Sequence, residues 1–282
     1  MNIPINHFKH AIEAGQLQIG LWAQLASNNV SEVIAGAGYD WLVIDAEHAP
    51  NVLTTVNSQL QAVHGGSAHP VVRVPWNDMV AIKGYLDIGA QSLLIPYIDT
   101  AEQARNAVAY TRYPPQGVRG YSAAPRASLY GRVKDYPQVY ENELCVILQI
   151  ETPVGLKNIE EIAAVEGVTG LFIGPGDLST TLGHVGNPQH PEVVALIEDA
   201  IRRIAACGKP SGILTSDVAM AQRFIDCGCV FAAVGSDLGL LARGSEQLLA
   251  KFRNRRSADD PTRIPAVATA TGNRHLSDKC QP

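Results

Sequence analysis

The sequence contains no apolar stretch long enough to cross a membrane as a helix, in any of its 282 residues. Residues 1–9 contain no apolar core, so we expect no secretory signal peptide there. Charged residues make up only 17% of the chain and the net charge is −5, which provides no basic surface for nucleic acid or anionic lipid. We therefore expect a protein that binds neither membranes nor nucleic acids.

Cysteines are also few, and their number is odd, which argues against a framework of disulfides. The five cysteines are Cys145, Cys207, Cys227, Cys229 and Cys280. Two of them fall in a predicted strand and a predicted helix, so we expect reduced thiols and a cytoplasmic location. Hydrophobic residues make up 46% of the chain, which is enough for one large α/β domain or two small ones.

Short apolar runs without polar alternation recur along the chain and are separated by segments with helical periodicity. Such runs are typical of strands that are buried on both faces. The predicted strands are Ile19–Leu25, Trp41–Asp45, Val71–Val74, Ser92–Tyr97, Val146–Glu151, Gly170–Ile173, Ser211–Thr215 and Phe231–Gly235. The predicted helices are Val30–Ala37, Leu53–Val63, Met79–Ile88, Ala101–Thr111, Val154–Val165, Glu192–Cys207, Val218–Asp226 and Leu240–Phe252. Eight strands that are each followed by a helix predict a closed parallel (β/α)8 barrel rather than a doubly wound sheet.

Two segments depart from this repeat. Residues 113–142 form one long connection that is rich in proline and glycine, which predicts a functional loop or lid. After Phe252 the composition shifts to charged residues with few apolar ones, which predicts a mostly disordered tail. The predicted organisation is therefore a barrel over residues 1–252, followed by a tail over residues 253–282.

Acidic residues follow three of the predicted strands directly. Asp45 ends one strand, Glu151 ends another, and Asp177 follows the next strand along the chain. The carboxyl ends of barrel strands meet at one face, where barrel enzymes carry their active sites. Two carboxylates at neighbouring strand ends suit a hard divalent cation such as Mg²⁺ or Mn²⁺. The alternative is that Glu151 and Asp177 only cap the helices that follow them.

His48 and Arg73 are the other candidate functional side chains. His48 lies three residues after Asp45, and an imidazole oriented by Asp45, Glu47 or Asp87 suits proton transfer near neutral pH. The alternative is an ordinary surface histidine. Arg73 lies within an apolar strand and needs a partner, either an internal carboxylate or a substrate carboxylate or oxyanion. Its place near the end of the strand favours the substrate.

Other motifs narrow the chemistry. The run from Gly174 to Ser179 lacks the Lys-Ser/Thr ending of a nucleotide loop, and it suits a small carboxylate bound at a helix start. Because that ending is missing, we expect no nucleotide cofactor. No lysine stands at the carboxyl end of a predicted strand, so we also expect no Schiff base. No Gly-x-Ser-x-Gly elbow is present. Carbonyl chemistry by this chain is therefore expected to use a metal.

Together these motifs resemble those of the HpcH/HpaI aldolases, the metal-dependent class II pyruvate aldolases of the phosphoenolpyruvate/pyruvate barrel superfamily. The resemblance runs in order across residues 15–252. The matching motifs are Asp45-Ala46-Glu47-His48-Ala49-Pro50, Arg73-Val74-Pro75, Leu93-Leu94-Ile95-Pro96, Pro114-Pro115-x-Gly117-x-Arg119-Gly120, Gln149-Ile150-Glu151-Thr152, Gly174-Pro175-Gly176-Asp177-Leu178-Ser179 and Val234-Gly235-x-Asp237.

The resemblance implies a barrel whose last helix is exchanged between subunits, in a homohexamer built from dimers. It implies that Glu151 and Asp177 hold Mg²⁺, Mn²⁺ or Co²⁺. Arg73 would bind the carbonyl or enolate oxygen of pyruvate, and Gln149 belongs with the substrate-binding residues. The backbone N–H groups of Gly176 and Asp177 would bind the pyruvate carboxylate. Gly176 departs from the family pattern, in which alanine is common.

For proton transfer, the resemblance implies His48 assisted by Asp45 and by Asp87 of a neighbouring subunit. The implied activity is reversible aldol cleavage of a 4-hydroxy-2-oxo acid to pyruvate and an aldehyde, a carbon–carbon lyase reaction of aromatic compound catabolism. Arg126 in the long loop suits the remote carboxylate of an acidic semialdehyde, or else fixes the loop or a subunit interface.

Two alternative functions stay open. A citrate-lyase-like enzyme would cleave an acyl-CoA thioester, and the clustered Arg119, Arg126 and Arg132 are the candidates for its adenosine phosphates. A non-catalytic metabolite-binding barrel is the third possibility, and the intact set of candidate site residues argues against it.

Overall fold

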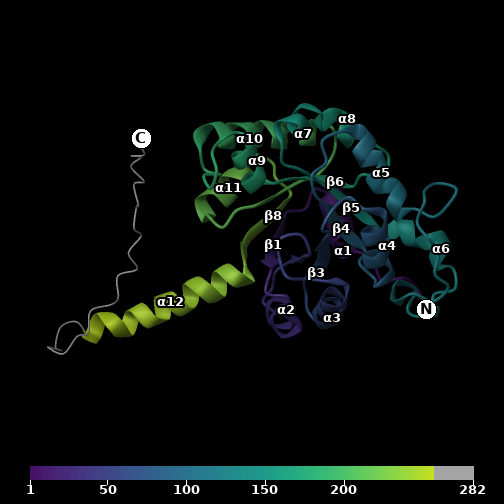
Figure 1. Ribbon diagram of the computed structural model, residues 1–282, viewed down its shortest axis with the longest axis horizontal. Helices are drawn as coiled ribbons and strands as arrows, with labels where there is room; N and C mark the ends of the chain where they lie inside the picture. Colours follow the sequence, from purple (N-terminus) through teal and green to yellow (C-terminus); the bar gives the residue numbers. More distant parts are fainter. Residues whose placement is uncertain (257–282) are drawn as a thin grey trace, which may run out of the picture. The chain divides into compact units, whose positions relative to one another are not determined.

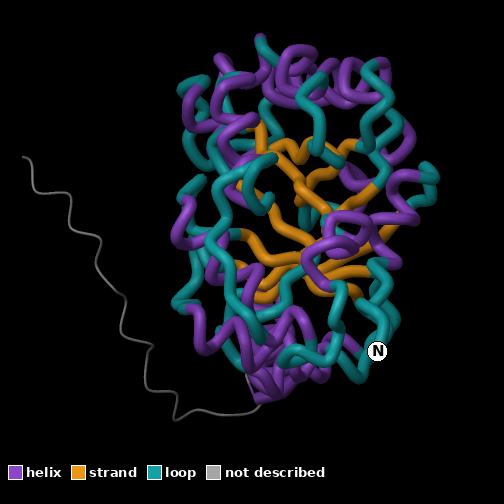
Figure 2. The backbone as a smooth tube through the Cα atoms, turned by 90° about the vertical axis from the view of Figure 1, so that its right-hand side faces the viewer, coloured by secondary structure: helices purple, strands orange, loops and turns teal. Residues whose placement is uncertain are grey.

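The computed structural model describes residues 1–256 of the chain. Eight parallel strands close into a barrel in sequence order, with β8 paired to β1. The strands are β1 (Gln18–Ala23), β2 (Trp41–Asp45), β3 (His69–Arg73), β4 (Ser92–Ile95), β5 (Cys145–Ile150), β6 (Gly170–Ile173), β7 (Ser211–Leu214) and β8 (Phe231–Ser236). Helices surround the strands (Figure 1, Figure 2). The predicted (β/α)8 barrel is confirmed.

The helices agree closely with the predicted ones, and three of them have identical bounds: α3 (Leu53–Val63), α5 (Ala101–Thr111) and α11 (Val218–Asp226). The other helices that follow strands are α2 (Asn28–Ala35), α4 (Met79–Asp87), α7 (Pro153–Lys157), α8 (Ile159–Ala163), α9 (Pro175–Thr181), α10 (Pro191–Ala206) and α12 (Asp237–Arg256). The helix predicted over residues 154–165 is thus two helices separated by Asn158, whose side chain donates to the carbonyl of Asp99 over 2.7 Å.

A helix that the sequence reading missed, α1 (His7–Glu13), packs against the amino end of the barrel. The Asn6 side chain accepts a hydrogen bond from the backbone N–H of Lys9 and caps this helix. The Phe8 ring stacks on Trp41 at 5.2 Å and meets Phe231 edge-on at 5.7 Å. These contacts fill the amino end of the barrel with aromatic side chains and leave the carboxyl end for the site.

Alternation along the strands decides which side chains enter the barrel. The interior cluster includes Trp41 and Val43 from β2, Val71 from β3, and Cys145 and Ile147 from β5. Continuing each alternation toward the carboxyl end brings a second set of side chains into the barrel mouth. This set consists of Asp45, Arg73, Gln149 and Glu151. The strand pattern alone therefore gathers four of the predicted site residues.

The long connection between α5 and β5 is folded. It contains two short 3₁₀ segments, η1 (Arg126–Ser128) and η2 (Tyr140–Glu143), and the helix α6 (Tyr136–Val139). A small core of Val133, Tyr136 and Tyr140 holds it together. Its role as a functional loop stays a prediction.

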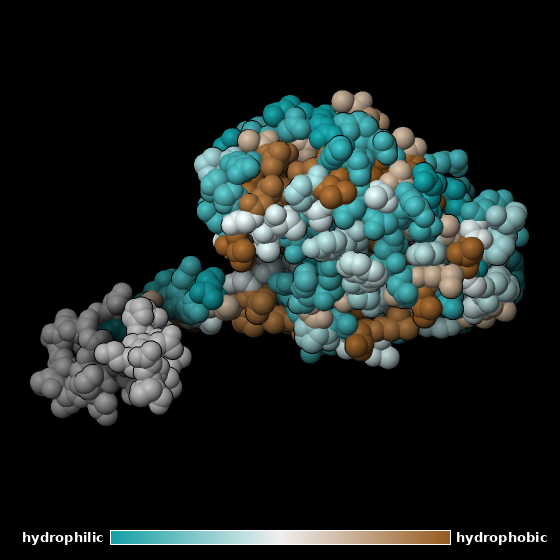
Figure 3. Space-filling model, turned by 45° about the horizontal axis from the view of Figure 1, so that its top comes forward, coloured by the Kyte–Doolittle hydropathy of each residue, from teal (hydrophilic) through white to brown (hydrophobic). Residues whose placement is uncertain are grey.

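The chain divides into two units, Met1–Leu241 and Ala242–Pro282. Helix α12 begins in the first unit and continues into the second, so the predicted boundary at residue 252 falls inside this helix. From residue 257 on, the predicted tail lies outside the described residues. Among the described residues, no helix combines the length and apolar character that crossing a membrane requires. The face in Figure 3 is mostly hydrophilic, with hydrophobic residues in small groups.

Candidate active site

Glu151 is a buried carboxylate at the carboxyl end of β5, with 1% of its surface exposed. Its Oε1 accepts a hydrogen bond from the backbone N–H of Tyr97 at 2.9 Å, and its Oε2 accepts one from Gln149 Nε2 at 2.5 Å. Burial raises the pKa of Glu151 to about 7, and the nearby Glu47 and Asp177 carboxylates add to the rise. A buried carboxylate with acidic neighbours is a site that favours a bound cation.

Neither metal candidate acts as a helix cap. Thr152 caps α7, because its side chain accepts from the backbone N–H of Gly155, and Glu151 is left free of that role. Helix α9 begins after Gly174 and carries Asp177 in its first turn. Among the described residues, no group donates a hydrogen bond to the Asp177 side chain, so its oxygens are available to a ligand. A buried carboxylate beside a free one fits a hard divalent cation.

Gly174 shows how tightly β6 packs on this site. It follows Ile173, which pairs with Ile150 of β5, so Gly174 lies beside Glu151. A Cβ atom at Gly174 would lie 2.5 Å from Glu151 Oε2 and 3.2 Å from Gln149 Nε2. The same atom at Gly176 would meet nothing within 4 Å. A side chain at position 174 would therefore collide with the Glu151 carboxylate, whereas position 176 has room for one.

Arg73 has an internal partner. Its Nε donates to Asp45 Oδ1 at 2.9 Å and its NH2 donates to Asp45 Oδ2 at 2.7 Å. Its NH1 forms an ion pair with Glu47 Oε2 at 2.9 Å. The guanidinium carbon lies 5.1 Å from the centre of the Trp22 ring, which is a cation–π contact. The internal-carboxylate alternative for Arg73 is thus present.

His48 lies at the edge of this cluster, and 58% of its side chain is exposed. Its Nε2 is 3.9 Å from Glu47 Oε2, so Glu47 is the carboxylate closest to pairing with the imidazole. Asp45 contacts His48 only through the backbone, by accepting its N–H at 3.3 Å. Burial raises the pKa of Glu47, while the charges of Arg73 and His48 oppose that rise.

The sequence reading did not assign roles to Tyr97 and Trp22, and it considered Glu47 only as a partner of His48. Tyr97 has a φ of 59°, a left-handed value that is rare for a bulky side chain, and this conformation directs its N–H to Glu151. The Tyr97 ring lies 5.6 Å from that of Trp76, which is 53% exposed. No sequence pattern marks a strained backbone, so only the coordinates could identify Tyr97.

Asp87 and Arg126 lie at the other end of the barrel. Asp87 ends α4 and accepts a hydrogen bond from Arg119 NH2 at 2.8 Å. Arg126 NH1 donates to the carbonyl of Ile88 at 2.6 Å. Arg126 also lines a cavity of about 1090 Å³ together with Gln18 and His69, which begin β1 and β3. Within one chain, the structure therefore does not bring Asp87 or Arg126 to Glu151.

Comparison with known proteins now identifies the family. The family model of the HpcH/HpaI aldolase/citrate lyase family matches residues 18–244. The chain belongs to this family. It is 54% identical to a pyruvate aldolase of Rhizobium etli, over 89% of this chain and 99% of the relative. It is also 54% identical to a 4-hydroxy-2-oxo-heptane-1,7-dioate aldolase of Klebsiella pneumoniae, over 88% of this chain and 94% of the relative.

A solved structure of an HpcH/HpaI aldolase/citrate lyase family protein from Burkholderia cenocepacia superposes with a TM-score of 0.85 at 38% identity. The match covers 88% of this chain and 99% of the other. The predicted family and the predicted enzyme class, an aldolase, are confirmed. Because the two relatives named above, each 54% identical to this chain, are named as aldolases, the citrate-lyase-like alternative has less support.

Proposed function

We propose that this aldolase cleaves a 4-hydroxy-2-oxo acid reversibly to pyruvate and an aldehyde, with Glu151 and Asp177 holding a divalent metal. The observation that supports this most directly is the buried Glu151 beside the free Asp177, above an interior that is otherwise filled. When bound there, the cation would polarise the C2 carbonyl of the substrate. Mg²⁺, Mn²⁺ and Co²⁺ all suit these oxygen ligands.

The chain's own residues would bind and orient the 2-oxo acid. The backbone N–H groups of Gly176 and Asp177 lie in the first turn of α9 and would bind the substrate carboxylate. The free N–H groups of Arg73 would stabilise the negative charge that develops on the C2 oxygen. Gln149 supports this indirectly, because its Nε2 holds Glu151 in place.

Cleavage needs a base for the proton of the C4 hydroxyl group. We assign that role to His48, which is exposed at the mouth and has its Nε2 at 3.9 Å from Glu47 Oε2. When the C3–C4 bond breaks, its electron pair enters the enolate and the aldehyde is released. Protonation of C3 then gives pyruvate, and the reverse sequence joins pyruvate to an aldehyde.

Asp87 and Arg126 can reach a metal site of this kind only in another subunit. We therefore propose a homo-oligomer, a hexamer built from dimers, in which these residues complete the neighbouring site. Side chains of α12 support assembly, because Leu240, Leu241 and Leu248 are 57%, 62% and 59% exposed in the single chain. Arg126 would bind the remote carboxylate of an acidic semialdehyde acceptor.

The function is tested by following pyruvate release from 4-hydroxy-2-oxoheptanedioate and, separately, from a CoA thioester of a citrate-like acid. The proposal predicts release from the free acid only, loss of release after chelation, and recovery with Mg²⁺, Mn²⁺ or Co²⁺. Release that persists after thorough chelation, or pyruvate trapped on the protein by borohydride, would rule out the metal-dependent assignment.

Site sharing is tested by mixing two inactive variants, Glu151→Gln and Arg126→Ala, and allowing their subunits to exchange. If Arg126 acts in the neighbouring site, some sites of the mixed oligomer contain both intact residues and activity returns. If the mixture stays inactive although exchange is demonstrated by mass, Arg126 does not complete a neighbour's site. We also propose a cytoplasmic location, supported by Cys145, Cys207, Cys227 and Cys229, which form no disulfide with one another.

A further inference from the structure

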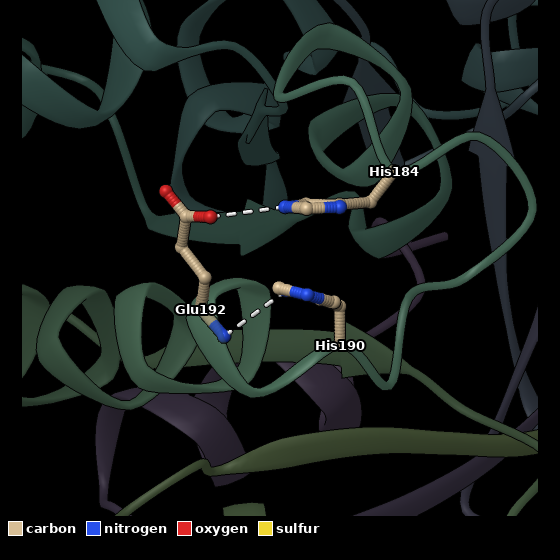
Figure 4. Close-up of side chains that lie close together, drawn as sticks. All are labelled: His184, His190 and Glu192. Carbon is tan, nitrogen blue, oxygen red and sulfur yellow. Dashed lines mark hydrogen bonds and ion pairs between the residues drawn. The ribbon is translucent and has the colours of Figure 1, made fainter.

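Two histidines of the loop between α9 and α10 and a glutamate in the first turn of α10 lie close together, outside the site described above. His184 Nε2 lies 2.9 Å from Glu192 Oε2. The rings of His184 and His190 stack with their centres 3.5 Å apart and their planes at 16° (Figure 4). One ligand atom from each of the three residues lies within 4.8 Å of the other two. Figure 4 shows the Glu192 side chain beside both rings.

The backbone of this loop is fixed by its own hydrogen bonds. The N–H of His184 donates to the carbonyl of Ser179 at 2.7 Å. The N–H of His190 donates to the carbonyl of Asn187, and the N–H of Asn187 donates to the carbonyl of His184 at 2.9 Å. Gly183 and Gly186 supply left-handed φ values of 85° and 72° at the two turns. The loop backbone thus keeps the two histidines next to each other.

We propose that His184, His190 and Glu192 form a second metal site, selective for a transition metal ion such as Zn²⁺ or Co²⁺. Two imidazoles and one carboxylate are the donor set that suits these ions, whereas Mg²⁺ prefers oxygen ligands alone. The side chains are partly exposed, so a fourth position is open to water or to another ligand.

Coordination requires the two imidazole rings to turn out of their stack. Around a tetrahedral ion with bonds of about 2.0–2.1 Å, ligand atoms lie roughly 3.3 Å apart. His184 Nε2 and Glu192 Oε2 are already closer than that. Each imidazole lone pair lies in its ring plane, so both rings must rotate about their side-chain torsions to direct a nitrogen at one ion. The Nδ1 of His190 accepts a 3.3 Å bond from the Glu192 N–H, which the ion would replace. Ion binding at Nε2 of His184 would replace the hydrogen bond to Glu192, and the neutral ring would then carry its proton on Nδ1.

This site is separate from the proposed catalytic metal. Asp177 lies in the first turn of α9, whereas His184 lies beyond the end of that helix. The test therefore uses the Glu151→Gln/Asp177→Asn variant, which lacks the catalytic carboxylates. Co²⁺ binding to this chelator-stripped protein is followed by calorimetry and by the visible absorption of four-coordinate Co²⁺. The loss of aldolase activity in this variant reports on the proposed function and not on the second site.

The expected result is one bound Co²⁺ per chain, with strong visible absorption. Adding His184→Ala, His190→Ala or Glu192→Gln should weaken binding by at least about tenfold, because loss even of a group that only supports a ligand costs that much. His10→Ala is the matched control, because His10 pairs with Glu143 at 3.0 Å but lies outside the three-residue cluster. No Co²⁺ binding, or equal losses in His184→Ala and His10→Ala, would overturn the proposal. If the alanine variants misfold, Glu192→Gln is the test: weakened Co²⁺ binding supports the site, and unchanged binding overturns it.

Discussion

The guanidinium of Arg73 and the carboxylate of Asp45 face each other in register on β3 and β2, joined by two hydrogen bonds of 2.9 and 2.7 Å. Asp45 is completely buried and Arg73 is 7% exposed. Burial opposes ionisation of Asp45, but hydrogen bonding and the charge of Arg73 outweigh it and hold the pKa of that carboxyl below its usual value. Arg73 thus has a structural task in addition to the one proposed for it in catalysis.

The first prediction separates these two tasks. Arg73→Ala should cost about 3–5 kcal/mol of unfolding free energy, because it leaves a buried carboxylate without its partner. Adding Asp45→Asn should recover most of that stability, since the buried charge is gone, while cleavage stays abolished. Denaturant unfolding and a cleavage assay on both variants are the measurements. If Arg73→Ala unfolds at the same denaturant concentration as the unmodified protein, the pair does not stabilise the fold.

The same pair fixes the response to acid. Because the pKa of Asp45 is depressed by folding, its stabilisation is present above about pH 4 and is lost as the pH falls through the lower folded-state value. The Arg73→Ala/Asp45→Asn variant should therefore show a smaller loss of stability in this acid range. If this double variant and the unmodified protein unfold identically in acid, the Asp45–Arg73 pair does not determine the response to acid.

The second prediction concerns Glu151, whose pKa burial raises to about 7. A proton and a metal ion compete for this carboxylate, so metal affinity should fall as the pH drops below about 7. Metal binding at pH 6 should release close to one proton, measured by calorimetry in buffers of different ionisation enthalpy. In Glu151→Gln, whatever binding remains should release no such proton. If the unmodified protein and Glu151→Gln release the same number of protons, a group other than Glu151 loses the proton.

In the metal-free protein, Glu151 and Asp45 change the unfolding free energy with pH in opposite directions, because the pKa of Glu151 is raised and that of Asp45 is lowered. Its contribution to stability is present at acid pH, below its unfolded value, and is lost as the pH rises toward and through about 7. Glu151→Gln should flatten this part of the stability curve. A slope that is unchanged in Glu151→Gln would mean that another group is responsible.

The third prediction uses the two glycines before Asp177 as a matched pair. Gly174→Ala should lose metal affinity and activity, because the added Cβ would fall 2.5 Å from Glu151 Oε2 and 2.9 Å from its Cβ. Gly176→Ala meets nothing within 4 Å and has no left-handed φ, so it should add about 0.4–1 kcal/mol of stability and keep activity. Metal titration and thermal unfolding of both variants check this contrast, and similar behaviour of the two would refute it.

The fourth prediction concerns His48 as the base. His48→Ala should lower cleavage by roughly 10²–10⁴-fold, the usual contribution of a general base, while metal binding is unchanged. The rates are compared above the pKa of Glu151, so that the metal site is ionised in both proteins. His64→Ala, at the end of α3, is the control for loss of an exposed histidine and should leave cleavage intact. If His48→Ala also keeps its cleavage rate, His48 is a surface residue.

Much of the site could be predicted because strand alternation and strand order decide it. Asp45 and Glu151 end apolar runs. In the barrel, each belongs to the alternate residues of its strand whose side chains point inward. The alternative that these acids are caps could not be excluded from sequence, since only coordinates show that Thr152 takes the cap of α7. Helix α1 was missed because Phe8 and Ile12 give just one turn of apolar spacing.

Other features depend on long-range contacts that sequence spacing does not encode. Arg73 was expected to favour substrate, yet it is paired with Asp45. The pairing became visible only when the register of β2 and β3 was known. The stacked His184 and His190 are six positions apart, and a loop with two left-handed glycines brings them together. The proposed roles of Asp87 and Arg126 depend on contacts between subunits, which the spacing of residues within one chain does not encode.

The central claim is that Glu151 and Asp177 hold a metal that, with Arg73, stabilises a pyruvate enolate. It is tested most directly by exchange of the pyruvate methyl protons in D₂O, followed by NMR without any aldehyde. The account predicts exchange that requires a divalent metal, is lost in Glu151→Gln, and falls by about 10²-fold or more in Arg73→Lys, which keeps the charge but loses the planar fork. Undiminished exchange after chelation, or in Glu151→Gln, would contradict it.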